Sequence, residues 1–278
     1  MVTQIQTFFL KQIFLTIRKT PKTIFNAAAR SIFIRANLSR QQSSFTIKNC
    51  YMGNSEGESV EDLTLMQISG LAVTIMNTTL SGFSGSIPDF GSLLEIEASS
   101  TVIESTSFSN LYFPRLSNTQ TGLVSISSTR VQDAEILILN SKFMDITIGQ
   151  MPLLSIMVLT TVNITIGDDS LFSQIYWKEQ LFSFFARDLT ISFINSTLNL
   201  SGASNQPAPI GFTIQNPNAD IIFQNTRIVW GLSRQDHLLK FGANDKRNIT
   251  ILDCLIVSES TEHLQSKQAT SANFNSCS

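Results

Sequence analysis

The sequence predicts an all-β chain that folds as a parallel β-helix, a solenoid of about eight turns. The first observation is a column of Asn-like residues that recurs at spacings of 28, 28, 35, 29, 26, 30 and 28 residues. The second is the alternation of apolar residues in twos before each member, which is the period of a strand and not of a helix. The members of this marker column are Asn49, Asn77, Ser105, Asn140, Asp169, Asn195, Asn225 and Asp253.

Each turn is expected to hold at least two short strands. β-Branched or aromatic residues stand two and four positions before the markers, as Phe45 and Ile47 do before Asn49. An earlier strand in each turn is typified by residues 93–96 and 123–126. Such a strand pair buries little alone, so we expect the turns to stack into parallel sheets around one continuous core.

The marker residues are expected to lie at a tight turn, because Asn and Asp tolerate the left-handed backbone conformation and bond to neighbouring backbone groups. One residue after each marker comes a small side chain: Cys50, Thr78, Thr106, Ser141, Ser170, Ser196, Thr226 and Cys254. Three residues after each marker comes a large apolar one: Met52, Leu80, Phe108, Phe143, Phe172, Leu198, Ile228 and Ile256. We therefore predict that Phe143 and Phe172 point inward and stack about 5 Å apart in adjacent turns.

Two irregularities lead to local predictions. The one long spacing predicts that Asn110–Gly122 is a protruding loop. Upstream of Asp169 the apolar residues fall one place early, which predicts a bulge or widened turn at Gly167–Asp168, with Gly167 adopting positive φ and Asp168 turned to solvent.

Composition agrees with a globular solenoid. The chain has 278 residues, 42% of them hydrophobic and only 14% charged, with a net charge of −2. This balance argues against a nucleic-acid partner, which bulk positive charge would attract. The uncharged stretch 146–167 approaches the length of a membrane span, but Gln150, Pro152 and Asn163 and its strand register argue against a transmembrane helix.

The two ends differ from the repeats in residues 31–258. Residues 1–30 are basic and carry apolar residues at helical spacing, which favours an α-helical cap over the open end of the solenoid. A targeting segment (a signal peptide or an organellar presequence) and a further upstream turn are the alternatives. Residues 259–278 form a polar C-terminal tail.

The repeat columns resemble the right-handed parallel β-helix of the pectin-lyase-like class, over about residues 31–258. Phrases such as residues 45–54 are also similar to the short repeats of polymorphic outer-membrane proteins and of ciliate surface proteins. The right-handedness is implied by this resemblance and does not follow from the spacing.

Because many members of that class act on acidic polysaccharides, an enzyme is one hypothesis. A hydrolase needs paired carboxylates across the glycosidic bond, and Asp168-Asp169 is the one matching pair. A lyase resembling pectate lyase would stack acids for calcium, but the outward column of Glu95 continues as Ser125, Ser155, Ser183 and Lys240. Arg234, Asp236 and His237 share one charged loop, which we interpret as solvated surface. No catalytic residue, metal site or cofactor is therefore predicted.

A carbohydrate-binding or adhesive module is the second hypothesis. Aromatic residues that recur beyond the large apolar column would line one edge, where sugar rings could stack. The candidates are Tyr112, Tyr176, Trp177 and Trp230, with Phe83 and Phe113 in the same group. The alternative role, which we favour, is that these side chains cap the turn and cover the core.

The third and preferred hypothesis is a non-catalytic structural module of an extracellular or cell-surface protein, with carbohydrate or other surface proteins as partners. Sequons for N-glycosylation occur at Asn37, Asn77, Asn163, Asn195, Asn199 and Asn248. Cys50 and Cys254 share one column but lie seven turns apart, too far for a disulfide, so both are expected to fill the small core slot. Cys277 lies in the polar tail.

Overall fold

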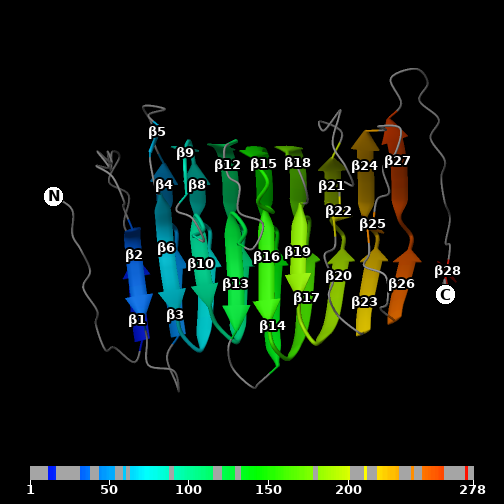
Figure 1. The fold of residues 1–278 in the computed structure, drawn as a ribbon, viewed down its shortest axis with the longest axis horizontal. Coiled ribbons are helices and arrows are strands. Elements are labelled where there is room, and N and C mark those ends of the chain that lie inside the picture. Colours follow the sequence, from blue (N-terminus) through cyan, green and yellow to red (C-terminus); the bar gives the residue numbers. More distant parts are fainter. Residues whose placement is uncertain are drawn as a thin grey trace.

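The computed structural model describes residues 12–16, 32–37, 44–53, 59–60, 63–87, 91–114, 121–128, 133–177, 181–200, 210–211, 218–231, 239–240, 246–259 and 273–274. Its regular elements are all strands, which follow one another around the axis of a solenoid (Figure 1). The chain advances one turn at a time from the N-terminal side to the C-terminal side, so residues one repeat apart lie side by side.

Three long sheets form the faces of the solenoid. Sheet A contains β1 (Gln12–Thr16), β3 (Ser44–Lys48), β7 (Ala72–Met76), β11 (Ser100–Glu104), β14 (Ala134–Leu139), β17 (Thr161–Gly167), β20 (Asp188–Ile194), β23 (Asn218–Gln224), β26 (Lys246–Leu252) and β28 (Asn273–Phe274). Sheet B contains β2 (Ile32–Asn37), β6 (Thr64–Ser69), β10 (Leu94–Glu97), β13 (Val124–Ser128), β16 (Leu154–Val158) and β19 (Phe182–Phe185).

Sheet C contains β4 (Tyr51–Gly53), β8 (Thr79–Ser81), β12 (Ser107–Phe113), β15 (Lys142–Ile148), β18 (Leu171–Tyr176), β21 (Thr197–Leu200), β24 (Arg227–Gly231) and β27 (Leu255–Glu259). The short strands β5 (Ser59–Val60) and β9 (Ser84–Gly85) also belong to it, and β22 (Ile210–Gly211) and β25 (Leu239–Lys240) form a separate pair. Since sheet B has six strands, the structure describes about six turns, and the expected count of about eight is not confirmed.

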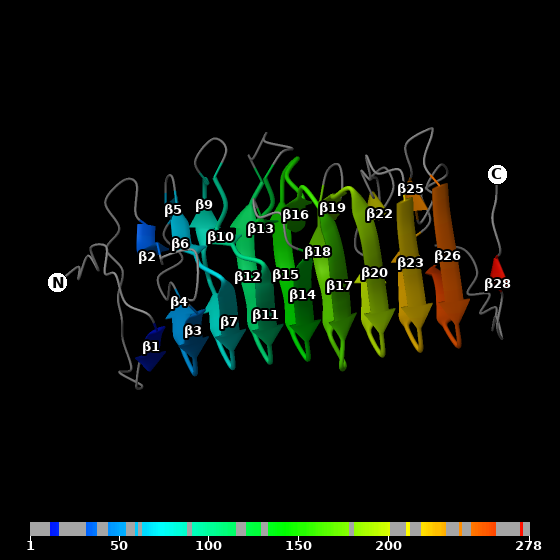
Figure 2. The same cartoon turned by 90° about the horizontal axis from the view of Figure 1, so that it is seen from below.

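Strand pairing confirms the predicted parallel solenoid. Each strand of sheet A pairs with its counterpart one turn later, as Ile103 of β11 does with Ile138 of β14. Figure 2 shows these strands side by side along the axis. Among the described pairs, β26 with β28 is the antiparallel exception.

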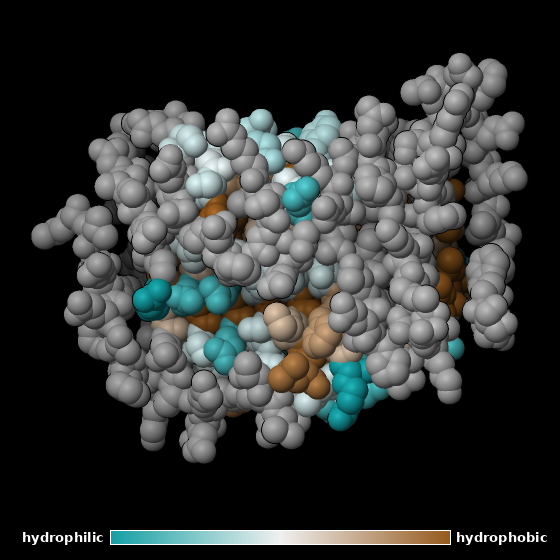
Figure 3. Space-filling model, in the orientation of Figure 1, coloured by the Kyte–Doolittle hydropathy of each residue, from teal (hydrophilic) through white to brown (hydrophobic). Residues whose placement is uncertain are grey.

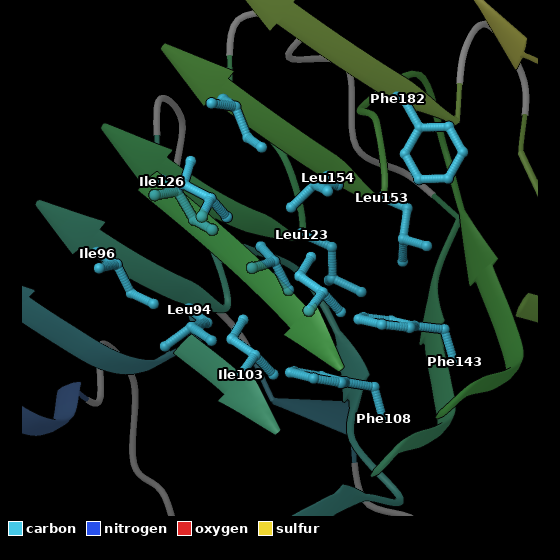
Figure 4. Close-up of a cluster of buried hydrophobic side chains, with 14 of the residues drawn as sticks. Leu94, Ile96, Ile103, Phe108, Leu123, Ile126, Phe143, Leu153, Leu154 and Phe182 are labelled. Atoms are coloured by element: carbon cyan, nitrogen blue, oxygen red, sulfur yellow. The ribbon is translucent and has the colours of Figure 1, made fainter. Parts of the chain in front are cut away.

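The core is one continuous column of side chains from all three sheets (Figure 4). Phe108, Phe143 and Phe172 stack in successive turns, with ring centroids 4.7 Å apart at each step and planes within 4° of parallel. The predicted inward stacking of Phe143 and Phe172 is confirmed. Phe182 of sheet B meets Phe172 edge-on at 5.5 Å, which joins two faces of the core.

The marker column forms the turn between sheets A and C. All eight marker residues have positive φ, between 46° and 65°, as predicted from their tolerance of the left-handed region. The backbone N–H of a marker residue donates to a carbonyl oxygen of the next turn along the axis, as when Asn140 N donates to Gly167 O at 3.0 Å. Each of the first seven marker turns is therefore held by its successor.

The small residue after each marker does more than fill space. The Thr106 hydroxyl lies 3.0 Å from Glu104 O and 3.4 Å from Ile75 O of the preceding turn. The hydroxyl donates its one hydrogen to these two carbonyl oxygens. Thr106 N donates to the Ser141 hydroxyl of the next turn at 3.2 Å. Ser141, Ser170, Ser196 and Thr226 repeat these contacts with carbonyl oxygens. We call this series the hydroxyl ladder.

Cysteine replaces the hydroxyl at two rungs of this column. Cys50 and Cys254 are both buried thiols, as predicted, and their sulfur atoms donate to Lys48 O at 3.4 Å and Leu252 O at 3.2 Å. Burial raises the pKa of the Cys254 thiol, so this group is kept protonated as a donor. Cys277 lies outside the described residues.

The widened turn at Asp168 is confirmed, but the residue that bends is not the predicted one. Asp168 and Asp169 both have positive φ, 51° and 65°, whereas Gly167 ends strand β17 and is buried. Ile164 and Ile166 point inward, and Asp168 is exposed, as predicted. Asp tolerates the left-handed region, so the extra residue itself takes the bend. Gly167 instead lies close to the backbone of the next turn, where an added Cβ would lie 3.3 Å from Ile194 O.

The prediction of one loop over Asn110–Gly122 is wrong for its first four residues. Asn110–Phe113 belong to β12, whose second half pairs with β15, and Leu111 and Phe113 are buried. The long spacing has two sources. Phe113 and Val124 are separated by 11 positions where Ile148 and Leu154, their partners in the next turn, are separated by 6. Two further residues are added between β13 and β14, relative to β16 and β17.

The predicted helical cap is wrong over Gln12–Thr16, which form strand β1. β1 pairs in parallel with β3, from Gln12 with Ser44 to Thr16 with Lys48. The apolar residues in this stretch therefore extend sheet A by one strand instead of forming a helix. The rest of residues 1–30 lie outside the described part, as does most of the 259–278 tail.

Candidate functional site

The outward face of sheet B is the first candidate site, because the lyase hypothesis depends on its residues. In the parallel register Glu95 is followed by Ser125, Ser155 and Ser183, as predicted. Lys240 instead pairs with Gly211, in the separate two-stranded sheet. The column of Glu95 is thus a run of serines over the three following turns.

Before Glu95 the same column is a chain of polar contacts. Arg35 Nε donates to Gln67 Oε1 at 2.9 Å, and Gln67 Nε2 donates to Glu95 Oε2 at 3.2 Å. Burial raises the pKa of Glu95, the hydrogen bond from Gln67 lowers it, and the charge of nearby Glu97 raises it. This carboxyl group is therefore harder to ionise than usual. It accepts a hydrogen bond from the Gln67 side chain of the preceding turn.

The neighbouring outward column of sheet B changes character along the axis. Ser69 donates to Glu97 at 3.2 Å near the N-terminal side, and the same column continues through Ser127 to Met157 and Phe185. Met157 and Phe185 are 46% and 40% exposed. Figure 3 shows polar side chains toward the N-terminal side of one face and apolar ones nearer its middle.

Within the described residues, no group of three or more His, Cys, Asp and Glu side chains is placed to hold a metal ion. Asp168 and Asp169 are both exposed at the marker turn, where Asp169 N donates to Asn195 O at 2.9 Å. The left-handed backbone conformation of this turn, which Asp tolerates, explains both residues. Arg234, Asp236 and His237 lie outside the described residues.

A second bend, five residues after the marker, lies in the strands of sheet C. Asn110, Asp145 and Gln174 occupy it in successive turns with φ of 53° to 54°, and Gly82 occupies it one turn earlier with φ of 76°. The strand register skips these residues, so Leu111 follows Ser109 in pairing with β15. This bend was not predicted from the sequence. Its signal was a Gly, Asn, Asp or Gln five residues after four consecutive markers.

The second bend decides which aromatic residues are exposed. Beyond it the alternation resumes, so the seventh residue after the marker points out and the sixth and eighth point in. Tyr112 and Tyr176 are 55% and 49% exposed, and Thr147 lies between them in register.

Trp177, in contrast, is 2% exposed, so it does not belong to an exposed binding edge, and the favoured prediction that it covers the core is confirmed. It is the eighth residue after its marker and packs into the core as Phe113 does. Phe83 is buried as well. Trp230 ends the register between β21 and β24, paired with Leu200, and its side chain lies outside the described part.

The candidate glycosylation sites fall on several faces. Asn77 and Asn195 are exposed marker residues, Asn163 is exposed on β17, and Asn199 is half-buried on β21. Asn248 is exposed and its amide donates to Asp220 Oδ1 at 2.8 Å. The remaining sequon, at Asn37, lies in β2, and its side chain is outside the described part.

Comparison of the chain with models of protein families, with curated proteins and with solved structures gives no match. In the part of the chain that the structure describes, no helix has the length and apolar character needed to cross a membrane.

Proposed function

We propose that this chain is a non-catalytic structural module, a rigid rod of an extracellular or cell-surface protein. The observation that carries the proposal is the repetition of the same marker turn and hydroxyl ladder around a continuous core. Each turn hydrogen-bonds to the next along the axis, so bending the rod would break several bonds at once. Such a rod can hold attached segments at a fixed separation.

The surface location is supported by exposed sequons. Asn77, Asn163 and Asn195 are on the outside of the solenoid, where a glycan can extend without displacing core residues. We also infer that the solenoid is right-handed and pectin-lyase-like. The asparagine column favours this, as does the strong preference of parallel strand connections for the right hand.

Two measurements test this function. Antibodies raised against the folded chain should label intact cells of the source organism, and glycopeptide mass spectrometry should find occupied Asn77, Asn163 or Asn195. Labelling that needs permeabilised cells, with all three asparagines unmodified, would contradict the surface location.

The enzyme alternative has its own readout. The purified chain should release neither reducing ends nor unsaturated sugars from acidic polysaccharides such as polygalacturonate. Release that depends on Asp168 or Asp169 would replace the structural proposal with a hydrolase or lyase.

A further inference from the structure

We propose that the bent face of sheet C binds a neutral glycan chain along the solenoid axis. The site spans three adjacent turns and combines an aromatic row with a hydrogen-bonding row. We call it the tyrosine strip; its members are Tyr112, Thr147, Tyr176, Asn110, Asp145 and Gln174.

The aromatic row is a deviation from the pattern of its own strands. Every other described aromatic side chain in β12, β15 and β18 (Phe108, Phe113, Phe143 and Phe172) is fully buried, as is Trp177 directly after β18. Tyr112 and Tyr176 alone are half exposed, and both stand at the same outward position. Their half-exposed rings can therefore contact a ligand.

The spacing of the two tyrosines suits an extended chain of sugars. They lie two turns apart, which is roughly 10 Å at the usual distance between neighbouring strands. The smaller Thr147 stands between them in register. The apolar faces of pyranose rings pack on aromatic rings, and the tyrosine hydroxyl adds a donor and an acceptor.

The hydrogen-bonding row runs beside the aromatic one. Asn110, Asp145 and Gln174 are all exposed at the second bend, one per turn. Asn110 Nδ2 donates one hydrogen to Ser81 Oγ at 3.4 Å. The other donors and acceptors of these amide and carboxylate groups follow one another at intervals of roughly 5 Å, which matches closely spaced sugar hydroxyls. Positive φ explains an Asn or Asp at this bend, but it does not favour Gln174. The exposed Gln174 side chain adds an amide group to this row.

Charge selects among ligands that stack on aromatic rings. Single-stranded nucleic acid needs a positively charged groove, whereas this strip contains the carboxylate of Asp145 and the chain carries a net charge of −2. The same carboxylate disfavours anionic polysaccharides. A neutral glycan fits both rows.

The test is affinity electrophoresis of the full chain in gels containing a neutral β-glucan, mannan or galactan, followed by calorimetry with the matching hexasaccharide. We expect retardation by at least one neutral polysaccharide. Tyr112→Ala and Tyr176→Ala should each weaken binding about three- to tenfold, and Gln174→Ala should weaken it as well. Because these side chains are exposed, the variants should melt as the wild type does.

Tyr51 provides the matched control, since it is 70% exposed on β4 of the same sheet but outside the strip. Tyr51→Ala should bind as the wild type does. The proposal is overturned if no neutral polysaccharide retards the chain, or if Tyr51→Ala loses as much affinity as the strip variants.

Discussion

The turn between sheets A and C and the outward face of sheet B follow opposite rules. At the turn, every marker has positive φ, and the residue directly after each marker is a small hydrogen-bond donor, from Cys50 to Cys254. On sheet B, one outward column runs from Ser69 through Glu97 and Ser127 to Phe185. The fold is therefore specified mainly at the turn. A sharp turn with a bonded neighbour on each side admits few residue types, whereas an outward strand position admits almost any.

The largest effect is expected in the core just beyond the turn. Phe143→Ala should lower the free energy of unfolding by about 3 to 5 kcal/mol, because it opens a cavity between the rings of Phe108 and Phe172. Urea denaturation measures this change. Phe185→Ala, on the outward face of sheet B, is the control and should cost distinctly less, because 40% of this side chain is already exposed and its removal leaves no closed cavity. Equal losses at the two sites would mean that the outward face of sheet B contributes as much to stability as the core beyond the turn.

The hydroxyl ladder should show the next largest effect. Thr106→Val keeps the shape of the buried side chain but removes the donor that faces Ile75 O and Glu104 O, at a cost of about 1 to 3 kcal/mol. Thr106→Ser keeps the donor and should lose less. If the serine variant were the less stable of the two in urea, packing and not hydrogen bonding would explain this column.

Backbone geometry at the marker gives a third test. Asn140 has φ of 46°, which a β-branched side chain strongly disfavours, so Asn140→Val should cost about 1 to 2 kcal/mol. Asn140→Gly should change thermal stability little, because glycine adopts this conformation readily. A glycine variant as unstable as the valine variant would instead assign the effect to the bond from Asn140 Nδ2 to Ser105 Oγ, which is 3.1 Å long.

The same contrast explains what could be predicted from the sequence. The marker turn, its small residues and the stack of Phe143 on Phe172 follow from one local pattern repeated every turn, so they were predictable. The burial of Trp177 was not, because it depends on the bend at Gln174, which reverses the alternation expected for a straight strand. The strand β1 was also missed, since apolar residues such as Ile13 and Phe14 fit both a helical and an extended pattern and the neighbouring β3 selects the latter.

On sheet B a pH-dependent effect is expected at Glu95. Its raised pKa means that the folded chain holds a proton that the unfolded chain has already lost, over the interval between the ordinary carboxyl pKa and the raised one. Stability from this group is therefore fully present below the ordinary pKa and is lost as pH rises through the raised pKa. Glu95→Gln removes this loss and should raise the melting temperature slightly at pH 7, with no gain near pH 3.5.

Glu135→Gln, at an exposed position of β14, serves as the control for the general effect of removing a negative charge. A gain at Glu95 that is the same at both pH values, or that Glu135→Gln reproduces, would mean that net charge and not burial of this carboxyl group is responsible.

The smallest effect is expected in the connection from sheet C to sheet B. Eleven positions separate Phe113 from Val124, but 6 suffice between the equivalent Ile148 and Leu154. Deleting five residues within 115–120 should therefore change the free energy of unfolding by less than about 1 kcal/mol, because the closure entropy of a loop varies slowly with its length. Deleting Asn140 alone should be far more damaging, since a shift of one residue turns every inward side chain of the following strand outward. Urea midpoints for the two deletions compare the regions directly. If the longer deletion were the more destabilising one, the connection and not the marker turn would set the register of the solenoid.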